Sequence, residues 1–239
     1  MTESNDKPFA GQTALVTGAS RGIGAATAQA LAARGAHVIL TARTAGDLEA
    51  VEEAIHAAGG TATIAPMDLV QGDSIGRLAA AVADRWGKLD ILVLNAATLG
   101  TLGAVPAFDP KDVATVMTLN VSAQAALLAA FDPLLRKAEH GRIIGLTTGL
   151  ARSPRAYWGM YGASKAAFEN LLLSYGEEVR DITRVRVALL NPGATRTKMR
   201  ARAYPGEDPA TVKAPEVVGE RIAAMLEDGI ETGQYERME

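Results

Sequence analysis

The sequence predicts an α/β fold in which a doubly wound parallel sheet of about seven strands carries helices on both faces. Short runs of apolar and β-branched residues alternate with longer segments that suit helices, and no linker or low-complexity stretch interrupts them. The short runs are apolar almost throughout, as is typical of parallel strands that are covered on both faces. Because strand and helix alternate regularly, we expect right-handed crossovers within a single domain, residues 1–239.

The strands and helices are assigned from these runs. The strand candidates are Thr13–Thr17, His37–Thr41, Thr61–Pro66, Ile91–Leu94, Arg142–Thr147 and Val185–Leu190, with a short one near Gln234. The helix candidates are Gly22–Arg34, Asp47–Ala58, Ser74–Trp86, Pro110–Lys137 and Tyr161–Asp181. Gly35 and Gly59 follow two of these helices, where a left-handed C-cap is expected. Asp109 and Pro110 suit the N-cap and first position of another.

The composition is that of a globular protein and excludes several kinds of site. The 239 residues are 48% hydrophobic and 21% charged, enough to bury one large core. A net charge of −3 does not suggest a nucleic-acid-binding surface, and the absence of cysteine excludes disulfides and thiol nucleophiles. The three histidines lie far apart without ligand spacing, so no metal site is expected.

Targeting and membrane segments are not expected either. The first residues are too polar for a secretory signal, and residues 1–9 are expected to form a short polar tail. No uninterrupted apolar run approaches the ~18 residues that a membrane-spanning helix needs. Together with the absence of cysteine, this favours a cytoplasmic location.

A glycine-rich turn lies between the first expected strand and the first expected helix. Gly18 permits a tight turn, Gly22 lets the backbone approach a phosphate, and Gly24 allows the helix to pack closely on the strand. The helix N-terminus then presents unpaired N–H groups and a partial positive charge to an anion. Turns also collect glycine for ordinary reasons, but this position favours nucleotide binding. The residues expected to contact the nucleotide here are Gly18, Ser20, Arg21, Gly22, Ile23 and Gly24.

The spacing Gly-x-x-x-Gly-x-Gly in this turn resembles that of short-chain dehydrogenases/reductases, and differs from the Gly-x-Gly-x-x-Gly of many other Rossmann folds. Further motifs of the family follow in family order across nearly the whole chain, at Asn95, Asn120, Tyr161–Lys165 and Pro192–Thr197. The resemblance implies a Rossmann fold and hydride transfer between a nicotinamide cofactor and a carbonyl or alcohol.

The end of the second expected strand indicates which nicotinamide cofactor binds. NAD-binding Rossmann proteins place an acid there to hold the ribose 2′-hydroxyl, and by comparison with the family Ala42 stands at that position. Arg43 can bind a 2′-phosphate through charge-assisted hydrogen bonds, with Arg21 as a second cation and Thr44 or Thr41 as a hydroxyl donor. The alternative is that Arg43 is a solvated loop cation. The combination predicts NADP(H).

Two other strand ends resemble cofactor contacts of the family. Asp68, followed by Leu69, matches the adenine-contacting aspartate, although an aspartate here could equally cap the next helix. Asn95 and Ala96 lie in the sequence Leu-Asn-Ala-Ala, where the family has Asn-Asn-Ala-Gly. Asn95 is expected to pin the central strands by hydrogen bonds beside the cofactor.

Tyr161 and Lys165 lie four residues apart, so both project from one face of a helix. A phenol with a pKa of about 10 is a poor acid or base near neutrality, and a neighbouring ammonium lowers that pKa. In the family, the tyrosine exchanges a proton with the substrate oxygen, and the lysine also binds the nicotinamide ribose. A tyrosine and a lysine at this spacing usually only pack, but their place after the fifth strand favours catalysis.

Two polar residues complete the catalytic set that the resemblance implies. The family has a serine thirteen residues before the tyrosine, where this chain has Thr148. Threonine keeps the hydroxyl but adds a methyl group and restricts χ1; the alternative is a plain β-branched strand end. Thr147 should point to the opposite face. Asn120 matches the residue with which the family holds a proton-relay water; the alternative is an exposed helix asparagine.

The loop after the sixth strand matches the family's Pro-Gly-x-x-x-Thr, which closes over the nicotinamide. The residues expected to contact the cofactor there are Pro192, Gly193, Thr195 and Thr197. Residues 194–215 are expected to form a mobile substrate lid. Its cations could attract an anionic substrate such as an acyl thioester, or could simply be solvated: Arg196, Lys198, Arg200 and Arg202. Arg155, Tyr157 and Trp158 are expected to line the pocket.

The sequence therefore predicts an NADP(H)-dependent oxidoreductase that acts on a carbonyl or alcohol, with a 3-oxoacyl thioester as one substrate. The competing hypothesis is an NADP(H)-binding regulatory protein that has lost catalysis, for which Thr148 leaves room. Family members commonly pair through the helices after strands four and five. We therefore expect a homodimer, favoured over a tetramer, through Ser122–Ala130 and Phe168–Ser174. No metal, nucleic acid or membrane partner is expected.

Overall fold

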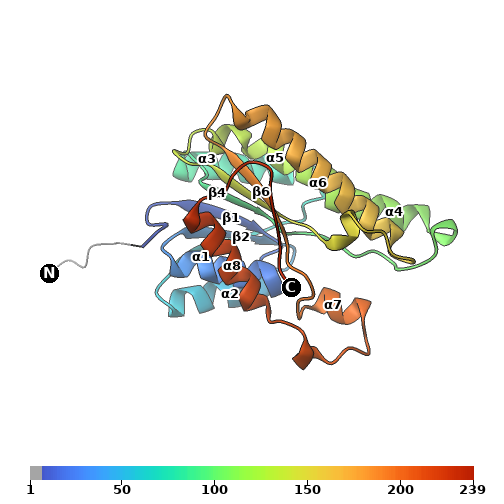
Figure 1. Cartoon of the computed structure of the whole chain (residues 1–239). Coiled ribbons are helices and arrows are strands. Elements are labelled where there is room, and N and C mark those ends of the chain that lie inside the picture. The colour runs from blue at the N-terminus through green and yellow to red at the C-terminus, as the bar shows by residue number, and fades with distance from the viewer. Residues whose placement is uncertain (1–6) are drawn as a thin grey trace.

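The computed structural model describes residues 7–239, which form a seven-stranded parallel sheet of order β3-β2-β1-β4-β5-β6-β7 (Figure 1). The strands are β1 (Thr13–Thr17), β2 (His37–Ala42), β3 (Thr61–Pro66), β4 (Ile91–Leu94), β5 (Arg142–Leu146), β6 (Arg186–Asn191) and β7 (Gln234–Arg237). The chain winds outward from β1 to β3, then returns to β4 and winds the other way. This doubly wound order confirms the predicted fold class.

Helices cover both faces of the sheet (Figure 1). One face carries α1 (Gly22–Ala33), α2 (Ala45–Ala57) and α8 (Pro215–Asp228). The other carries α3 (Ser74–Trp86), α5 (Ala123–Leu135) and α6 (Gly159–Arg180). The short helix α4 (Pro110–Met117) precedes α5, and α7 (Lys198–Ala203) lies in the connection from β6 to α8.

Each face of the sheet has its own apolar core, and successive strand residues contribute to opposite cores. In β1, Val16 packs under α1 and α8, whereas Leu15 packs under α3 and α5. In β2, Leu40 and Ile39 divide in the same way. Since both faces are buried, the central strands are largely apolar, which explains the continuous apolar runs in the sequence.

The predicted helix over 110–137 is interrupted, which corrects the sequence prediction. Thr118–Ser122 form a π-helical turn between α4 and α5, and Asn120 lies buried in it. π-turns inside helices occur frequently at functional sites because they redirect one side chain without ending the helix. The run Pro110–Leu135 is long and apolar enough to cross a membrane by length and composition alone, with a mean hydropathy of 1.5. A helix that packs on a sheet meets the same criterion.

Helix α8 was not among the predicted helices. It begins with Pro215 at its first position, and its buried residues Val218, Ile222 and Leu226 recur every fourth position. It packs on α1 at very short range, because a Cβ on Gly219 would lie 2.5 Å from the backbone carbon of Ala26. The apolar pattern of α8 was present in the sequence, but the predicted lid ended at Pro215, the first residue of this helix, and no helix was assigned after it.

The predicted polar tail is too long. Residues 1–6 lie outside the described part of the chain. Phe9, however, is fully buried, and its N–H donates to the Arg34 carbonyl at 2.9 Å. An apolar ring that joins the core cannot belong to a solvated tail, so the correction places Phe9 in the domain.

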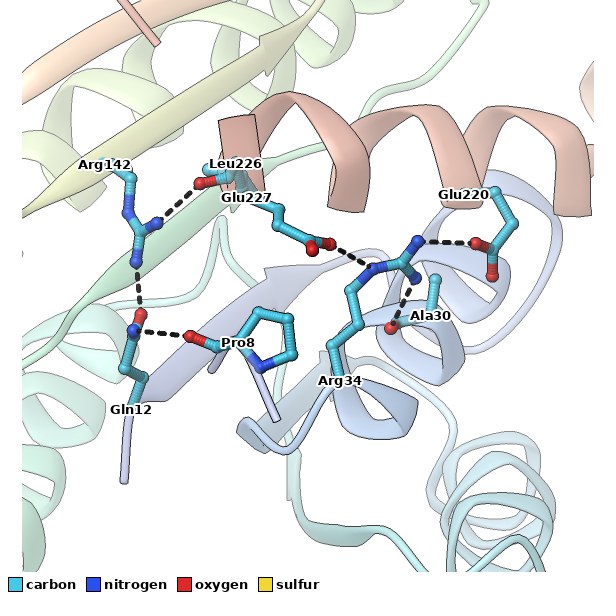
Figure 2. A network of polar contacts seen from close by, with 8 residues as sticks. All are labelled: Pro8, Gln12, Ala30, Arg34, Arg142, Glu220, Leu226 and Glu227. Atoms are coloured by element: carbon cyan, nitrogen blue, oxygen red, sulfur yellow. Dashed lines mark hydrogen bonds and ion pairs between the residues drawn. The ribbon is translucent and has the colours of Figure 1, made fainter. Parts of the chain in front are cut away.

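A polar network joins the N-terminal segment to β5 and α8 at the amino end of the sheet (Figure 2). The Arg142 guanidinium donates to the Leu226 carbonyl at 2.6 Å and to the Gln12 side chain. Nearby, Arg34, the C-cap of α1, forms ion pairs with Glu220 and Glu227 on α8, at 2.9 and 3.0 Å. The network lies at the edge opposite the predicted site, so its contribution is to the fold.

The close contact of α1 with α8 predicts that a glycine-to-alanine change inside it destabilises the protein, whereas one at an open helix position does not. Gly219→Ala should lower the free energy of unfolding by about 1–3 kcal/mol, because the methyl group forces two helix backbones apart. Gly46→Ala, in α2, should leave it unchanged or raise it by up to about 1 kcal/mol, because a Cβ there meets nothing within 4 Å. Urea unfolding of both variants checks this; equal effects would contradict the packing.

Candidate active site

The glycine turn lies at the carboxyl end of β1, where the strand order reverses between β1 and β4. Gly18 and Gly22 have positive φ angles of 66° and 55°. A Cβ on Gly18 would lie 2.9 Å from Asn95 Nδ2, and one on Gly24 would lie 2.2 Å from the Gly18 carbonyl oxygen. Glycine is therefore required at both positions. A Cβ on Gly22 would meet Thr197 Cγ2 at 3.2 Å, which places the loop after β6 beside this turn.

A polar junction fixes the turn to β4. The Thr17 hydroxyl donates to the Val93 carbonyl at 3.1 Å and accepts from the N–H groups of Asn95 and Ala96, both at 3.0 Å. Asn95 Nδ2 in turn donates to the carbonyls of Thr17 and Gly18, at 2.8 and 3.2 Å. These contacts are of the kind predicted for Asn95. With the turn held in this way, α1 begins beyond the carboxyl end of the sheet, and its first N–H groups lie there.

The residues predicted to recognise a 2′-phosphate lie around the loop after β2. Arg43 and Thr44 are exposed at the start of α2. Arg21 approaches the same helix, where its guanidinium lies 3.9 Å from the Asp47 carboxylate. Both of these side chains are about half exposed, so solvent screens the pair and Arg21 can turn to another anion. The cations and the glycine turn thus border one region of the surface.

Asp68 and Leu69 follow β3, farther from the centre of the sheet. Asp68 Oδ1 accepts the N–H of Val70 at 3.1 Å, so the carboxylate stabilises its own turn. The alternative, that Asp68 caps α3, is not what the structure shows, because Asp73 occupies the N-cap of that helix. Leu69 is buried in the core. The predicted contact of Asp68 with adenine stays a prediction.

Tyr161 and Lys165 project from the first turns of α6, at the carboxyl end of β5. Lys165 is 4% exposed, and its ammonium donates to the Leu146 carbonyl at 2.8 Å. It also lies 4.8 Å from the centre of the Phe168 ring. The lysine is thus held beside the end of β5 by a backbone acceptor and an aromatic ring.

Burial controls the proton affinities of this pair. It raises the pKa of Tyr161 to about 12. It lowers the pKa of Lys165 to about 8, although the Glu169 carboxylate opposes this change. The prediction that the ammonium lowers the tyrosine pKa is therefore wrong for this structure. The cause is desolvation of the phenolate, and the Lys165 ammonium is bonded to the Leu146 carbonyl.

Asn120, the one buried residue of the π-turn, lies beside the helix turn that carries Tyr161. Its Oδ1 accepts the N–H of Thr98 at 2.8 Å, and its Nδ2 donates to the Thr98 carbonyl at 2.9 Å and to Ser164 Oγ at 3.0 Å. Ser164 donates in turn to the Tyr161 carbonyl at 2.8 Å. Asn120 is 1% exposed, which rules out the alternative of an exposed helix asparagine. It joins the loop after β4 to the helix turn that carries Tyr161.

Thr148 follows β5 and begins a short 3-10 turn, Gly149–Ala151. Its hydroxyl accepts the N–H of Leu150 at 3.4 Å, a long contact that leaves the O–H free to donate elsewhere. Thr147 is buried and donates to Glu169 at 2.5 Å, on a different side of the strand end. The two threonines therefore divide as the alternation of strand side chains predicts.

The loop after β6 closes the other side of the site. Gly193 has a φ of 65°, and a Cβ on it would lie 2.7 Å from the Met238 carbonyl. Thr195 is buried and pairs with Lys213 across an isolated bridge. Thr197 caps α7, because its Oγ1 accepts the N–H of Arg200 at 3.1 Å. Pro192 begins this loop directly after β6.

Aromatic side chains connect the predicted lid to the turn before α6. Trp158 lies edge-on to Tyr161, with 6.3 Å between ring centres, and stacks on Tyr204 at 5.6 Å. Arg155 donates to the Tyr204 hydroxyl at 2.8 Å. Arg200 stacks on the Tyr204 ring at 3.7 Å and forms two hydrogen bonds to Glu207. Tyr157, with an unusual φ of 70°, is exposed.

The predicted lid is thus partly helical, and its four cations are not equivalent. Arg200 is neutralised by Glu207, and Arg202 donates to the Gly100 carbonyl at 3.1 Å. Arg196 and Lys198 are exposed. The positive charge available to a substrate is therefore smaller than the sequence suggests, and the mobility of residues 194–215 stays a prediction.

Comparison with known proteins identifies the family. A family profile described as short chain dehydrogenase matches residues 12–208. The chain belongs to the short chain dehydrogenase family.

Relatives in sequence and structure agree with this assignment. The uncharacterized oxidoreductase YciK of Escherichia coli K12 is 37% identical over 84% of this chain and 80% of its own length. A short chain dehydrogenase structure from Pseudomonas syringae has a TM-score of 0.93 and 38% identity, covering 98% of this chain and 97% of that one. A short chain dehydrogenase of Shigella flexneri 2a, complexed with NADP, has a TM-score of 0.91 and 33% identity, covering 97% and 98%.

Several residues around the site were not among those predicted from the sequence. Ser164 lies inside the Tyr-Gly-Ala-Ser-Lys motif, where it is buried beside Asn120. Its burial could have been suspected, because it lies on the side of the expected helix that faces the core. Glu169 lies four residues after Lys165, so the spacing that places Tyr161 and Lys165 on one helix face also places Glu169 there. Nothing in the sequence predicted the contacts of Tyr204 or Arg152, because they depend on how distant loops fold back.

The lowered pKa of Lys165 predicts a pH-dependent stability. An unfolded lysine titrates near a pKa of about 10.4, so between about pH 8 and 10.4 the folded protein without cofactor binds fewer protons than the unfolded chain. The free energy of unfolding contributed by Lys165 therefore rises with pH in that window. Lys165→Met lacks this rise. Its free energy of unfolding should therefore exceed that of the wild type by the largest amount below pH 8.

Urea unfolding at several pH values measures the difference between variant and wild type. Lys137→Met, which changes an exposed lysine, is the matched control and should show no such window. A constant difference between Lys165→Met and wild type from pH 7 to 10.5 would contradict the lowered pKa.

Proposed function

We propose that the chain is an NADP(H)-dependent oxidoreductase that interconverts a carbonyl and an alcohol. One observation carries the proposal: Tyr161 and the buried Lys165 lie on the first turns of α6, at the carboxyl end of β5. β5 is the strand next to β4, which the Thr17–Asn95 junction joins to the glycine turn. The family and the NADP complex of the Shigella relative support it. When bound, NADPH supplies the hydride.

The described residues fit such a cofactor. Gly18 and Gly24 are required by the close approach of the turn to its neighbours, and Gly22 leaves open backbone at the start of α1 for a pyrophosphate. We assign the 2′-phosphate to Arg43 and Arg21, and the adenine to Asp68 and Leu69. The other residues assigned to the cofactor are Ser20, Ile23, Thr44, Asn95, Ala96, Lys165, Pro192, Gly193, Thr195 and Thr197.

The catalytic proton is assigned to Tyr161. In reduction its hydroxyl donates to the substrate oxygen as negative charge develops there. A pKa raised to about 12 keeps the proton on the phenol until that moment. The positive charge of Lys165, one helical turn away, then stabilises the phenolate that remains. In oxidation the same groups act in reverse.

Thr148 and Asn120 support this step in different ways. The Thr148 hydroxyl, only weakly engaged by Leu150, is free to donate to the substrate oxygen and fix its orientation. Asn120 holds the turn of Tyr161 through Ser164, and we assign it the proton-relay water that the family places there. The aromatic wall of Trp158 and Tyr204 bounds the pocket on the lid side.

The substrate is assigned by class. A carbonyl compound that carries an anionic group, such as a 3-oxoacyl thioester with a phosphorylated arm, suits the exposed cations Arg196 and Lys198 together with Arg155. We further propose a cytoplasmic homodimer. Its interface is formed by α5 and α6, whose outward faces over Ser122–Ala130 and Phe168–Ser174 carry small and apolar side chains.

Tyr161→Phe should abolish turnover and leave NADPH binding intact, because the variant removes only the hydroxyl that transfers the proton. Turnover is measured as NADPH oxidation with a panel of aldehydes, ketones and 3-oxoacyl thioesters, and binding as quenching or enhancement of NADPH fluorescence. The loss should be at least about 10²-fold, the usual size of an acid–base contribution. Unchanged turnover would disprove the mechanism, and binding without turnover in the wild type would favour the regulatory hypothesis.

Arg43→Ala should weaken NADPH binding by about tenfold or more and change NADH binding little, because only NADPH carries the 2′-phosphate. Lys111→Ala, an exposed cation at the start of α4, is the control. Fluorescence titration with both cofactors gives the two dissociation constants. Equal losses for NADPH and NADH would show that Arg43 does not recognise the phosphate.

A further inference from the structure

A buried carboxylate lies one helical turn beyond Lys165, and the proposed mechanism does not use it. Glu169 is 7% exposed, and both of its oxygens are engaged. One accepts the Thr147 hydroxyl at 2.5 Å, and the other accepts Arg152 Nε at 2.8 Å. The two partners flank Thr148 in the sequence. Glu169 therefore binds the segment that carries Thr148 at residues on both sides of it.

The contacts continue from Arg152 to the loop after β6. The Arg152 guanidinium stacks on the Tyr235 ring of β7, with 3.6 Å from its central carbon to the ring centre. The Tyr235 hydroxyl accepts from Asn191 Nδ2 at 3.3 Å, and Asn191 Oδ1 accepts the N–H of Gly193 at 3.1 Å. One chain of contacts thus joins α6, the segment after β5 and the loop that we assign to the nicotinamide.

Such an arrangement is costly unless it has a function. Removing an ionised carboxylate from water is unfavourable, and replacing a buried ion pair by apolar side chains is often neutral or stabilising. Stability alone therefore gives little reason for Glu169 at a position that faces the core. Its place on the same helix face as Lys165 gives another.

We propose that Glu169 is a positioning residue, which holds residues 147–152 against α6 and supplies the negative charge that faces the ammonium of Lys165. The proposal rests on the proposed function in one respect, the role of Lys165 and Thr148 in catalysis. The arrangement has two separable parts. Thr147 and Arg152 set the position of the Thr148 backbone, and the carboxylate sets the charge on Lys165.

The electrostatic part follows from the groups around Lys165. Burial lowers its pKa to about 8, and Glu169 acts against that change. The titratable and charged groups that face the pair are Tyr161 on the same helix and Arg152 on the loop after β5. From β5 itself, the Leu146 carbonyl and Thr147 contribute only neutral dipoles. Without the Glu169 charge, less of Lys165 would be protonated at neutral pH.

Glu169→Gln tests the charge while it keeps the shape. Its amide oxygen can still accept from Arg152, and its NH₂ can donate to Thr147. The first readout is the pH dependence of Lys165 acetylation by acetic anhydride, followed by mass spectrometry, which reports the fraction of neutral amine and needs no turnover. The midpoint should fall below the wild-type value in Glu169→Gln. In Glu178→Gln, an exposed control on the same helix, it should not move.

The second readout is the pH profile of kcat with the best carbonyl substrate of the panel. Glu169→Gln should lose about tenfold near pH 8 and less at pH 6, because lower pH restores the ammonium. Thr147→Val keeps the charge of Glu169 and removes the hydrogen bond that Thr147 donates to it. It should leave the acetylation midpoint unchanged and lower kcat equally at every pH.

The possible outcomes separate the two parts of the proposal. A lowered midpoint in Glu169→Gln, with the pH-dependent loss, supports it. An unmoved midpoint, or losses that do not vary with pH in Glu169→Gln, overturns the electrostatic part; wild-type kcat in Thr147→Val overturns the positioning part. If the wild type turns over no carbonyl, the proposed function fails, yet the acetylation midpoint still tests the charge.

Discussion

The hydrogen bonds between Thr17 and Asn95 join β1 to β4 at the point where the strand order reverses. The rest of the site is built around that point. Thr17 Oγ1 bonds to three backbone groups of the segment from Val93 to Ala96, and Asn95 returns two bonds to β1 and its glycine turn. With β1 and β4 fixed together, the connections leave the edge in opposite directions. The region between them is where parallel sheets of this kind bind ligands.

The electrostatics of this region are governed by burial. Burial shifts both groups toward their neutral forms: it raises the pKa of Tyr161 to about 12 and lowers that of Lys165 to about 8, so that Lys165 still carries its charge at neutral pH. Glu169 is the charge that opposes this for the lysine. A site of this type holds its proton firmly until the reacting oxygen becomes negative, which suits a tyrosine that acts as an acid during carbonyl reduction.

Much of this could be predicted from the sequence, because the relevant signals are local. The strands are short continuous apolar runs, and their observed ends differ from prediction by at most one residue, as for β5, which ends at Leu146. The π-turn around Asn120 and the contacts of Glu169 with Thr147 and Arg152 could not be predicted. They depend on tertiary packing between segments, and the pKa of Tyr161 depends on desolvation that no spacing rule describes.

The central claim is that Tyr161 exchanges the catalytic proton once the cofactor site is filled, and its phenol pKa tests this most directly. The difference in phenolate absorbance between wild type and Tyr161→Phe isolates this one tyrosine during a pH titration. Without cofactor the pKa should lie near 12. With NADP⁺ bound it should fall, because the positive charges of Lys165 and the oxidised nicotinamide would then favour the phenolate. The same pKa with and without NADP⁺ would contradict the account.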